Sequence, residues 1–470
     1  MEAFSLAIAF LVLFFSIFFA AFRNASNVGT NLPPGGSGRP IVGETLDFVM
    51  NPEKFISDRM KKHSPDIFRT NFFGEKIVII CGPNGHKFLF SNEDKHFTAY
   101  LPQAMQKLFF SSQPKTDKLY RDSDVKLLRS PGFLKPEALV NYVAGMDSII
   151  QKHLKTHLEG KTEAKIHPFS RSLTLTLACR FFLGIENPER VAKLVSQFDI
   201  VTDGMHSLPL NVPRMAFYYA VKAAEVIRKE LADVVAEKKA RVLGSGAPTQ
   251  DLCTTMIVGG YMSDEEISEK LMGILVAGYS TVATTMTFVM KFVGERPDVY
   301  HKILSEQLEI SESKKPEEVL TLCWNDVQKV KYAWAVVCEA MRVVPPVLGT
   351  FREAITDFSY AGYTVPKGWK VFWTVNTTQK NPEYFQEPNK FDPSRFIKGE
   401  GMPLYAYVPF GGGPRMCPGK EYARLAILTF VHNMVKKFKW ELVEPNEKIL
   451  GSMMPLPEKV LPVRLRPRCV

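Results

Sequence analysis

The chain has 470 residues, 46% of them hydrophobic, and a formal net charge of +10 at pH 7. A chain of this length and composition can bury a large core. Its basic residues are dispersed and accompany no nucleic-acid-binding motif, which argues against a nucleic-acid partner and suits anionic membrane lipid or an acidic protein instead. The seven cysteines lack paired spacing, which argues against a disulfide-linked secreted domain and favours a reducing compartment.

An apolar run over residues 3–22, broken only by serines, lies at the start of the sequence and ends at Arg23. About twenty helical residues cross the hydrocarbon core of a bilayer. The run is longer than the apolar part of a signal peptide and has no positive charge before it, so we predict an uncleaved transmembrane anchor within residues 1–30. Since Arg23 follows the run and Glu2 precedes it, the positive-inside rule predicts a single pass with the body of the protein in the cytosol.

Residues 31–40 form a connector rich in proline and glycine. No internal repeat, linker or low-complexity stretch divides the chain after residue 40, and the motifs further along require one shared site. We therefore predict one catalytic domain over residues 31–470, with 31–40 as its hinge.

A long helix is predicted to begin after Ser263, which suits an N-cap and is followed by acidic residues. Its apolar part includes residues 271–281, where Ala277 and the glycine after it are small and where Ser280 and Thr281 carry hydroxyls. Small residues in a helix often serve only to let a neighbouring helix pack closely, so this segment alone does not identify a functional site.

Glu339 and Arg342 lie three residues apart, which places both side chains on one face of a predicted helix. Prolines at 345–346 end that helix, and Arg395 follows further on. The same Glu-x-x-Arg spacing recurs elsewhere in the chain, so the spacing is informative only in this context.

Cys417 lies on a glycine-rich loop, residues 410–419, that leads into a helix predicted from Glu421. Earlier in the chain, Arg352 is followed by a hairpin that we predict over residues 358–373, with a Pro-Lys-Gly turn. An iron-bound thiolate needs backbone N–H groups aimed at the sulfur, which tight glycine turns and a following helix N-terminus provide. For the cysteine alone, a buried structural role is the plain alternative.

The residues of this loop also match a known signature. Phe410, Gly413, Arg415, Cys417 and Gly419 have the spacing Phe-x-x-Gly-x-Arg-x-Cys-x-Gly, so the sequence resembles the cytochrome P-450 family. The resemblance implies haem b as the cofactor and Cys417 as the axial ligand of its iron. It also implies that Phe410, Arg415 and Gly419 contact the haem.

The remaining motifs occur in the order that this family has. The resemblance implies that Arg352 binds a haem propionate, that Ala277 leaves room for O2 beside the haem, and that Thr281 is a catalytic residue in proton delivery. It further implies a buried, structural charge triad of Glu339, Arg342 and Arg395.

Two positions depart from the family pattern. Ser280 stands where relatives usually have an acid, and we predict that Ser280 and Thr281 relay protons together through hydroxyls and water. The Trp-x-x-x-Arg motif that contacts a haem propionate in many relatives is missing near residue 125. Lys126 or Arg129 is the predicted substitute, with surface charge facing a partner as the alternative.

Beyond these motifs, the sequence resembles plant triterpenoid oxidases of the β-amyrin 28-monooxygenase group. The similarity is carried by segments such as 31–35, 87–93, 133–139, 207–211 and 409–425. It implies a mainly α fold with small peripheral β-sheets. It also implies that the protein is located in the endoplasmic reticulum membrane. It also implies oxidation of a hydrophobic terpenoid, a triterpene of the β-amyrin type, with O2 and with electrons from NADPH passed through NADPH–cytochrome P-450 reductase.

Position within the family also predicts the walls of a substrate pocket, namely 101–110, 208–213, Ile274 with Ala277, 347–350, and Met453 with Met454. Two other functions remain open at this stage. One is a haem-thiolate isomerase or dehydratase that needs no reductase, which the missing acid at Ser280 favours and the retained Thr281 opposes. The other is a membrane haem protein without catalytic activity.

Overall fold

The computed structural model describes residues 31–39, 43–72, 74–110, 134–205, 207, 209–245, 251–314, 321–398, 402–451 and 454–468. The predicted membrane anchor in residues 1–30 lies outside the described residues, as do Lys126, Arg129 and Met453. Residues 31–39 lie against the domain, because Arg69 N donates to Pro34 O at 2.8 Å and Thr364 N donates to Asn31 O at 2.8 Å.

The described helices are α2 (Thr45–Met50), α3 (Pro52–Lys62), α4 (Gly82–Ser91), α5 (Gln103–Phe109), α7 (Pro136–Leu139), η1 (Val140–Tyr142), α8 (Val143–His157), α9 (Ile166–Ala178), η2 (Cys179–Leu183), α10 (Pro188–Met205), α11 (Ala216–Ser245), α12 (Leu252–Gly259), α13 (Asp264–Glu295), α14 (Pro297–Glu312), α15 (Trp324–Lys329), α16 (Tyr332–Val343), η4 (Val375–Thr377), α17 (Arg395–Lys398), η5 (Gly413–Arg415) and α18 (Lys420–Lys437). The strands are β1 (Ile67–Phe72), β2 (Glu75–Ile80), β3 (Phe97–Ala99), β4 (Glu163–Lys165), β5 (Gly349–Ala354), β6 (Phe358–Tyr360), β7 (Tyr363–Val365), β8 (Lys370–Thr374), β9 (Phe438–Leu442), β10 (Ile449–Leu450), β11 (Leu456–Pro457) and β12 (Pro462–Pro467).

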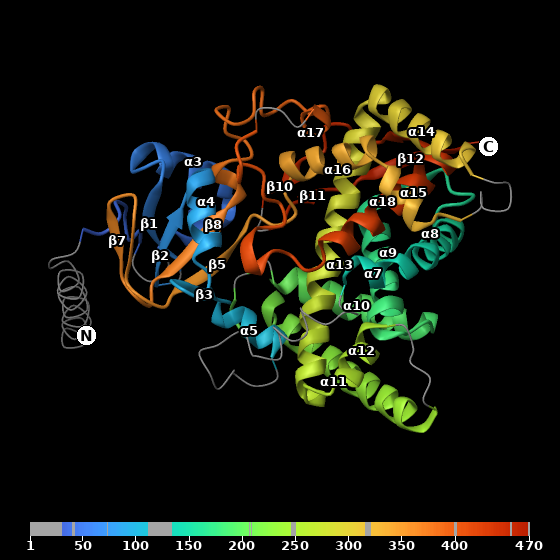
Figure 1. The fold of residues 1–470 in the computed structure, drawn as a ribbon, viewed down its shortest axis with the longest axis horizontal. Helices are drawn as coiled ribbons and strands as arrows, with labels where there is room; N and C mark the ends of the chain where they lie inside the picture. The colour runs from blue at the N-terminus through green and yellow to red at the C-terminus, as the bar shows by residue number, and fades with distance from the viewer. Residues whose placement is uncertain are drawn as a thin grey trace, which may run out of the picture.

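The domain has a sheet-rich side and a larger helical side (Figure 1). The largest described sheet has five strands in the order β1-β2-β8-β5-β3, in which β2 and β8 are parallel and the other neighbours are antiparallel. A three-stranded sheet, β4-β12-β9, lies on the helical side. The predicted fold class, mainly helical with small β-sheets, is confirmed.

The hairpin predicted over residues 358–373 is correct only in its first half. Strands β6 and β7 pair as a hairpin, but the turn lies at Ala361 and Gly362, whose φ values are +50° and +82°. Two successive residues with positive φ match the twist of a tight hairpin. After the Pro-Lys-Gly sequence the chain leaves this hairpin, and β8 joins the five-stranded sheet between β2 and β5.

Helix α13 crosses the middle of the domain (Figure 1) and packs against α9, α11, α16 and α18. The predicted start is correct. Ser263 forms a capping box with Glu266, in which Glu266 N donates to Ser263 Oγ at 3.2 Å and Ser263 N donates to Glu266 Oε2 at 2.9 Å. Among the described residues this is the one helix long and apolar enough to cross a membrane, but 72% of its most apolar stretch is buried inside the protein. It is a core helix.

Helix α16 is joined to the chain before the cysteine loop by the predicted charge triad. Glu339 and Arg342 are both fully buried, and their bidentate contact has distances of 2.7 and 2.8 Å. Arg395 Nε lies 3.4 Å from Glu339 Oε1, and the backbone N of Asp392 donates to the same oxygen at 2.8 Å. Arg342 also donates to the carbonyl of Gln379 at 2.9 Å. One carboxylate thus fixes two segments that are distant in sequence.

Replacing Arg342 with alanine is expected to lower the free energy of unfolding by about 3–5 kcal/mol, because it leaves the buried Glu339 carboxylate without its main partner. The matched control is Arg464→Ala, which removes an exposed pair with Glu163 (3.1 Å) and is expected to cost about 0–1 kcal/mol. Urea unfolding of the two variants measures the difference. Equal costs in both would contradict a dominant role for the buried pair.

Candidate active site

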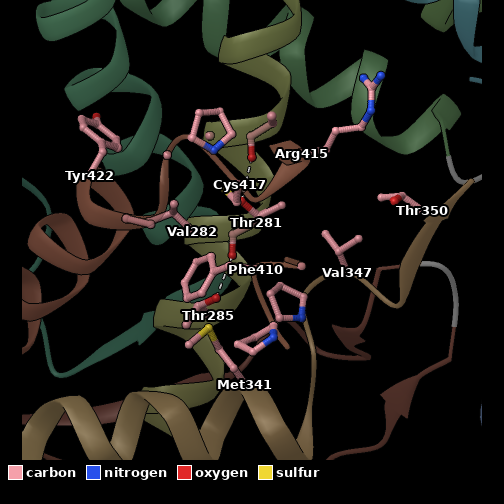
Figure 2. Close-up of a pocket in the computed structure, with 18 of the residues that line it drawn as sticks. Thr281, Val282, Thr285, Met341, Val347, Thr350, Phe410, Arg415, Cys417 and Tyr422 are labelled. Carbon is pink, nitrogen blue, oxygen red and sulfur yellow. Dashed lines mark hydrogen bonds between the residues drawn. The ribbon is translucent and has the colours of Figure 1, made fainter. Parts of the chain in front are cut away.

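A cavity of about 350 Å³ lies between α13, the segment from α16 into β5, and the cysteine loop (Figure 2). Of the residues predicted from sequence to act at the site, those that line it are Ala277, Thr281, Arg352, Phe410, Arg415, Cys417 and Gly419. Most of the remaining wall is apolar and includes Phe90, Leu134, Phe182, Ile274 and Met341. The fold therefore brings motifs from three distant parts of the chain to one cavity.

The cysteine loop is held in shape by close contacts with the end of α4. Cys417 N donates to Phe410 O at 2.9 Å. Gly413 has a φ of +67°, and a Cβ there would lie 2.4 Å from the carbonyl oxygen of Phe90. A Cβ on Gly412 would lie 2.6 Å from the Phe90 ring. Only glycine fits these positions, so the turn and its contact with α4 determine where the sulfur lies.

The environment of Cys417 suits a metal ligand better than an exposed nucleophile. Burial raises the pKa of the Cys417 thiol, while a hydrogen bond from the backbone of Gly419 and the charge of Lys420 act in the opposite direction. A bound metal cation stabilises a thiolate, so a cysteine that is mainly a thiol on its own can still bind iron as a thiolate. The N–H at Gly419 is placed to support that charge.

The face of α13 toward the cavity is lined by residues four apart. Ala277 is exposed although its neighbours Val276 and Tyr279 are buried, because it faces the cavity. Thr281 Oγ1 donates to Ala277 O at 2.7 Å, and Thr285 Oγ1 donates to Thr281 O at 2.9 Å. Thr285 was not predicted from sequence, although its spacing from Thr281 would have indicated the same helix face.

Ser280 is placed differently from Thr281. It is buried, and its hydroxyl contacts the sulfur of Met454 at 2.7 Å. It does not line the cavity, because consecutive residues of a helix point about 100° apart. The structure thus does not bring the Ser280 hydroxyl to the predicted site.

The predicted pocket walls are only partly those of this cavity. Ile274, Val347, Gly349 and Thr350 line it as expected. The described residues of 101–110 and 208–213 do not, and Leu108 is instead fully buried in the helical core. In α5, an apolar sequence reflects packing against α11, and Arg228 of α11 donates to Leu108 O at 2.9 Å.

Arg352 and Arg415 both line the cavity and share one partner that sequence reasoning did not find. Glu93 Oε1 lies 2.6 Å from Arg352 Nε, and Glu93 Oε2 lies 2.8 Å from Arg415 Nε. Glu93 is far from both arginines in sequence, and no local motif marks it. Together with the Cys417 sulfur and the apolar walls, two cavity-facing cations fit the needs of a haem with two carboxylates.

Comparison with known proteins places these features in a family. A family model described as cytochrome P450 matches residues 33–461. A β-amyrin 28-monooxygenase of Kalopanax septemlobus is 45% identical, covering 98% of each chain, and one of Medicago truncatula is 45% identical, covering 96% of this chain and 95% of its own. A β-amyrin 6-β-monooxygenase of Solanum lycopersicum is 44% identical, covering 98% of each chain. Among solved structures, retinoic acid bound cyanobacterial CYP120A1 matches with a TM-score of 0.81 and 28% identity, over 94% of this chain and all of that one.

Replacing Gly413 with alanine is expected to lower stability by about 1–3 kcal/mol more than Gly368→Ala does, because only at Gly413 does the new Cβ collide with a backbone carbonyl. Gly368 is the matched control, since its φ is +85° and nothing lies within 4 Å of its Cβ position. Thermal unfolding of the two variants checks the difference. If they unfold alike, the Phe90 contact does not restrain the loop.

Proposed function

The chain belongs to the cytochrome P450 family, and we propose that it is a membrane-anchored monooxygenase that oxidises a triterpene of the β-amyrin type. The observation that carries the proposal is near full-length similarity, at 44–45% identity, to monooxygenases named for β-amyrin. The apolar cavity beside Cys417 supports it, since such walls suit a rigid hydrocarbon skeleton. Because relatives named for oxidation at two different positions match almost equally, overall identity indicates the substrate class and not the carbon oxidised.

Haem b, thiolate-ligated, supplies the activation of O2 when bound. In this chain Cys417 would ligate the iron, with the backbone N–H of Gly419 toward the sulfur and with Phe410 in the cavity wall. Arg352 and Arg415 would bind the propionates, since both line the cavity and carry fixed positive charge. The apolar walls exclude bulk water and orient the substrate by shape. An NADPH-dependent reductase is proposed as the electron donor.

Thr281 is the proposed proton-handling residue. Thr281 lines the cavity and its hydroxyl rests on Ala277 O, and because a hydroxyl can accept a proton from water while it donates its own, it would relay a proton from water to a group in the cavity. Ser280, the proposed second member of the relay, would contribute only after its hydroxyl leaves the Met454 sulfur. Thr285 follows Thr281 on the same face and extends the row of hydroxyls.

Replacing Thr281 with alanine is expected to lower the product formed per NADPH consumed by about tenfold or more and to raise peroxide release, because a general acid–base group speeds its own step by about 10²–10⁴-fold and slowing that step lets peroxide release compete. The matched control is Thr287→Ala, a buried threonine of the same helix that contacts His167 at 3.3 Å and does not line the cavity. Its coupling should equal that of the parent. An unchanged ratio in Thr281→Ala would refute the assignment.

Co-expression in yeast with a reductase and a panel of triterpene cyclases tests the proposed function. We expect oxidised β-amyrin-type products by mass spectrometry, dependent on NADPH and lost in Cys417→Ser, whose reduced carbon monoxide complex should also lose the long-wavelength band of thiolate ligation. A second candidate, a haem-thiolate isomerase or dehydratase, is motivated by Ser280 in place of an acid. Product formation without NADPH and reductase would support it and overturn the proposal.

The proposed location is the endoplasmic reticulum membrane, with residues 1–30 as a single-pass anchor and the catalytic domain in the cytosol. Protease added to intact microsomes is expected to digest the catalytic domain, and protection until detergent is added would reverse this topology.

A further inference from the structure

A single buried carboxylate lies between the two arginines of the cavity. Glu93 follows α4, and its side chain has no exposed surface. Each of its oxygens contacts the Nε of one arginine, at 2.6 Å for Arg352 and 2.8 Å for Arg415. The three residues come from the α4–β3 turn, from β5 and from the cysteine loop.

We propose that Glu93 is a positioning residue that fixes both arginines toward the haem and, through its charge, lowers the reduction potential of the haem iron. The inference rests on the proposed haem site, and goes beyond it by assigning a role to a residue that touches neither the cofactor nor the substrate.

The contacts of Arg352 show how the positioning works. Its Nε is held by Glu93, and its Nη1 donates to Thr350 Oγ1 at 2.8 Å and to Phe351 O at 2.9 Å. The Thr350 hydroxyl is itself held, because Trp373 Nε1 donates to it at 2.9 Å. Nε and Nη1 are thus used for orientation, and among the described residues Nη2 has no hydrogen-bond partner, so it is left for a ligand in the cavity.

Arg415 is held in a similar way. Its Nε contacts Glu93, and its Nη2 contacts Asp94 Oδ1 at 2.5 Å. Asp94 is 68% exposed, whereas Glu93 is fully buried. Water screens the charge of Asp94, so of these two carboxylates Glu93 acts more strongly on the site.

The charge of Glu93 has a consequence for the iron. Two arginines carry a charge of +2, and the buried carboxylate reduces their sum to +1. Reduction of iron adds one negative charge to the site, which nearby positive charge stabilises. Neutralising Glu93 therefore favours the reduced form, and the midpoint potential rises.

The test is the midpoint potential of the purified full-length holoprotein, measured by spectroelectrochemistry without substrate. Glu93→Gln removes the charge at nearly constant size and is expected to favour the reduced form about tenfold, a rise of ~59 mV for a one-electron couple. Glu93→Asp keeps the charge and is expected to stay near the parent potential while retaining less haem per protein, because the shorter side chain reaches both arginines less well.

The matched control is Asp251→Asn, which neutralises a fully buried carboxylate that is paired with Lys238 at 2.6 Å and does not line the cavity. It is expected to leave the potential unchanged. An unchanged potential in Glu93→Gln, or an equal rise in Asp251→Asn, overturns the proposal.

If Glu93→Gln fails to retain haem, the haem content of Glu93→Asp decides: it is expected to exceed that of Glu93→Gln, because the aspartate keeps the charge that pairs with both arginines. A haem content in Glu93→Asp no higher than in Glu93→Gln overturns the proposal. Because the potential is measured without substrate, failure of the triterpene assay with an intact potential shift would refute the proposed substrate and leave the role of Glu93 standing.

Discussion

The site depends on a simple electrostatic constraint, that a buried charge must have a partner. Among the described residues of the domain, two buried carboxylates each bridge two arginines. Glu339 holds Arg342 and Arg395, and Glu93 holds Arg352 and Arg415. The first joins α16 to the segment before the cysteine loop, and the second joins that loop to β5 and to the end of α4. Removing either anion would leave like charges facing each other, so the geometry around Cys417 is fixed by charge as well as by apolar packing.

Helix α13 supplies the opposite wall, and its sequence shows how one helix serves both core and site. Most of its surface is buried against neighbouring helices, while Ala277, Thr281 and Thr285 lie on the one face that borders the cavity. Small and hydroxyl-bearing residues on this face keep space open without breaking the helix. The cavity is therefore a gap in an otherwise continuous core. The apolar side chains that line it limit the access of water.

Much of this site could be predicted from sequence where the determining residues are close together in the chain. The loop around Cys417, the Glu339–Arg342 pair and the N-cap at Ser263 all follow from local spacing. Glu93 could not be found in this way, because its partners are 259 and 322 residues away. Helix periodicity separates Ser280 from Thr281, but only the structure shows that Met454 lies opposite Ser280. An apolar segment such as α5 has the same sequence pattern whether it borders a cavity or packs in a core, so the sequence does not distinguish the two.

The cavity wall after α16 combines a fixed backbone with one adaptable side chain. A Cβ on Gly349 would lie 1.9 Å from Trp373 O, and Thr350 is tied to Arg352 and Trp373, so neither can change freely. Val347 has no such tie among the described side-chain contacts, and 36% of it is exposed. Of these three wall residues, Val347 is therefore the one whose side chain can change in size without breaking the contacts that hold Arg352 and Trp373 in place, so the shape of the cavity can vary there independently of its charged end.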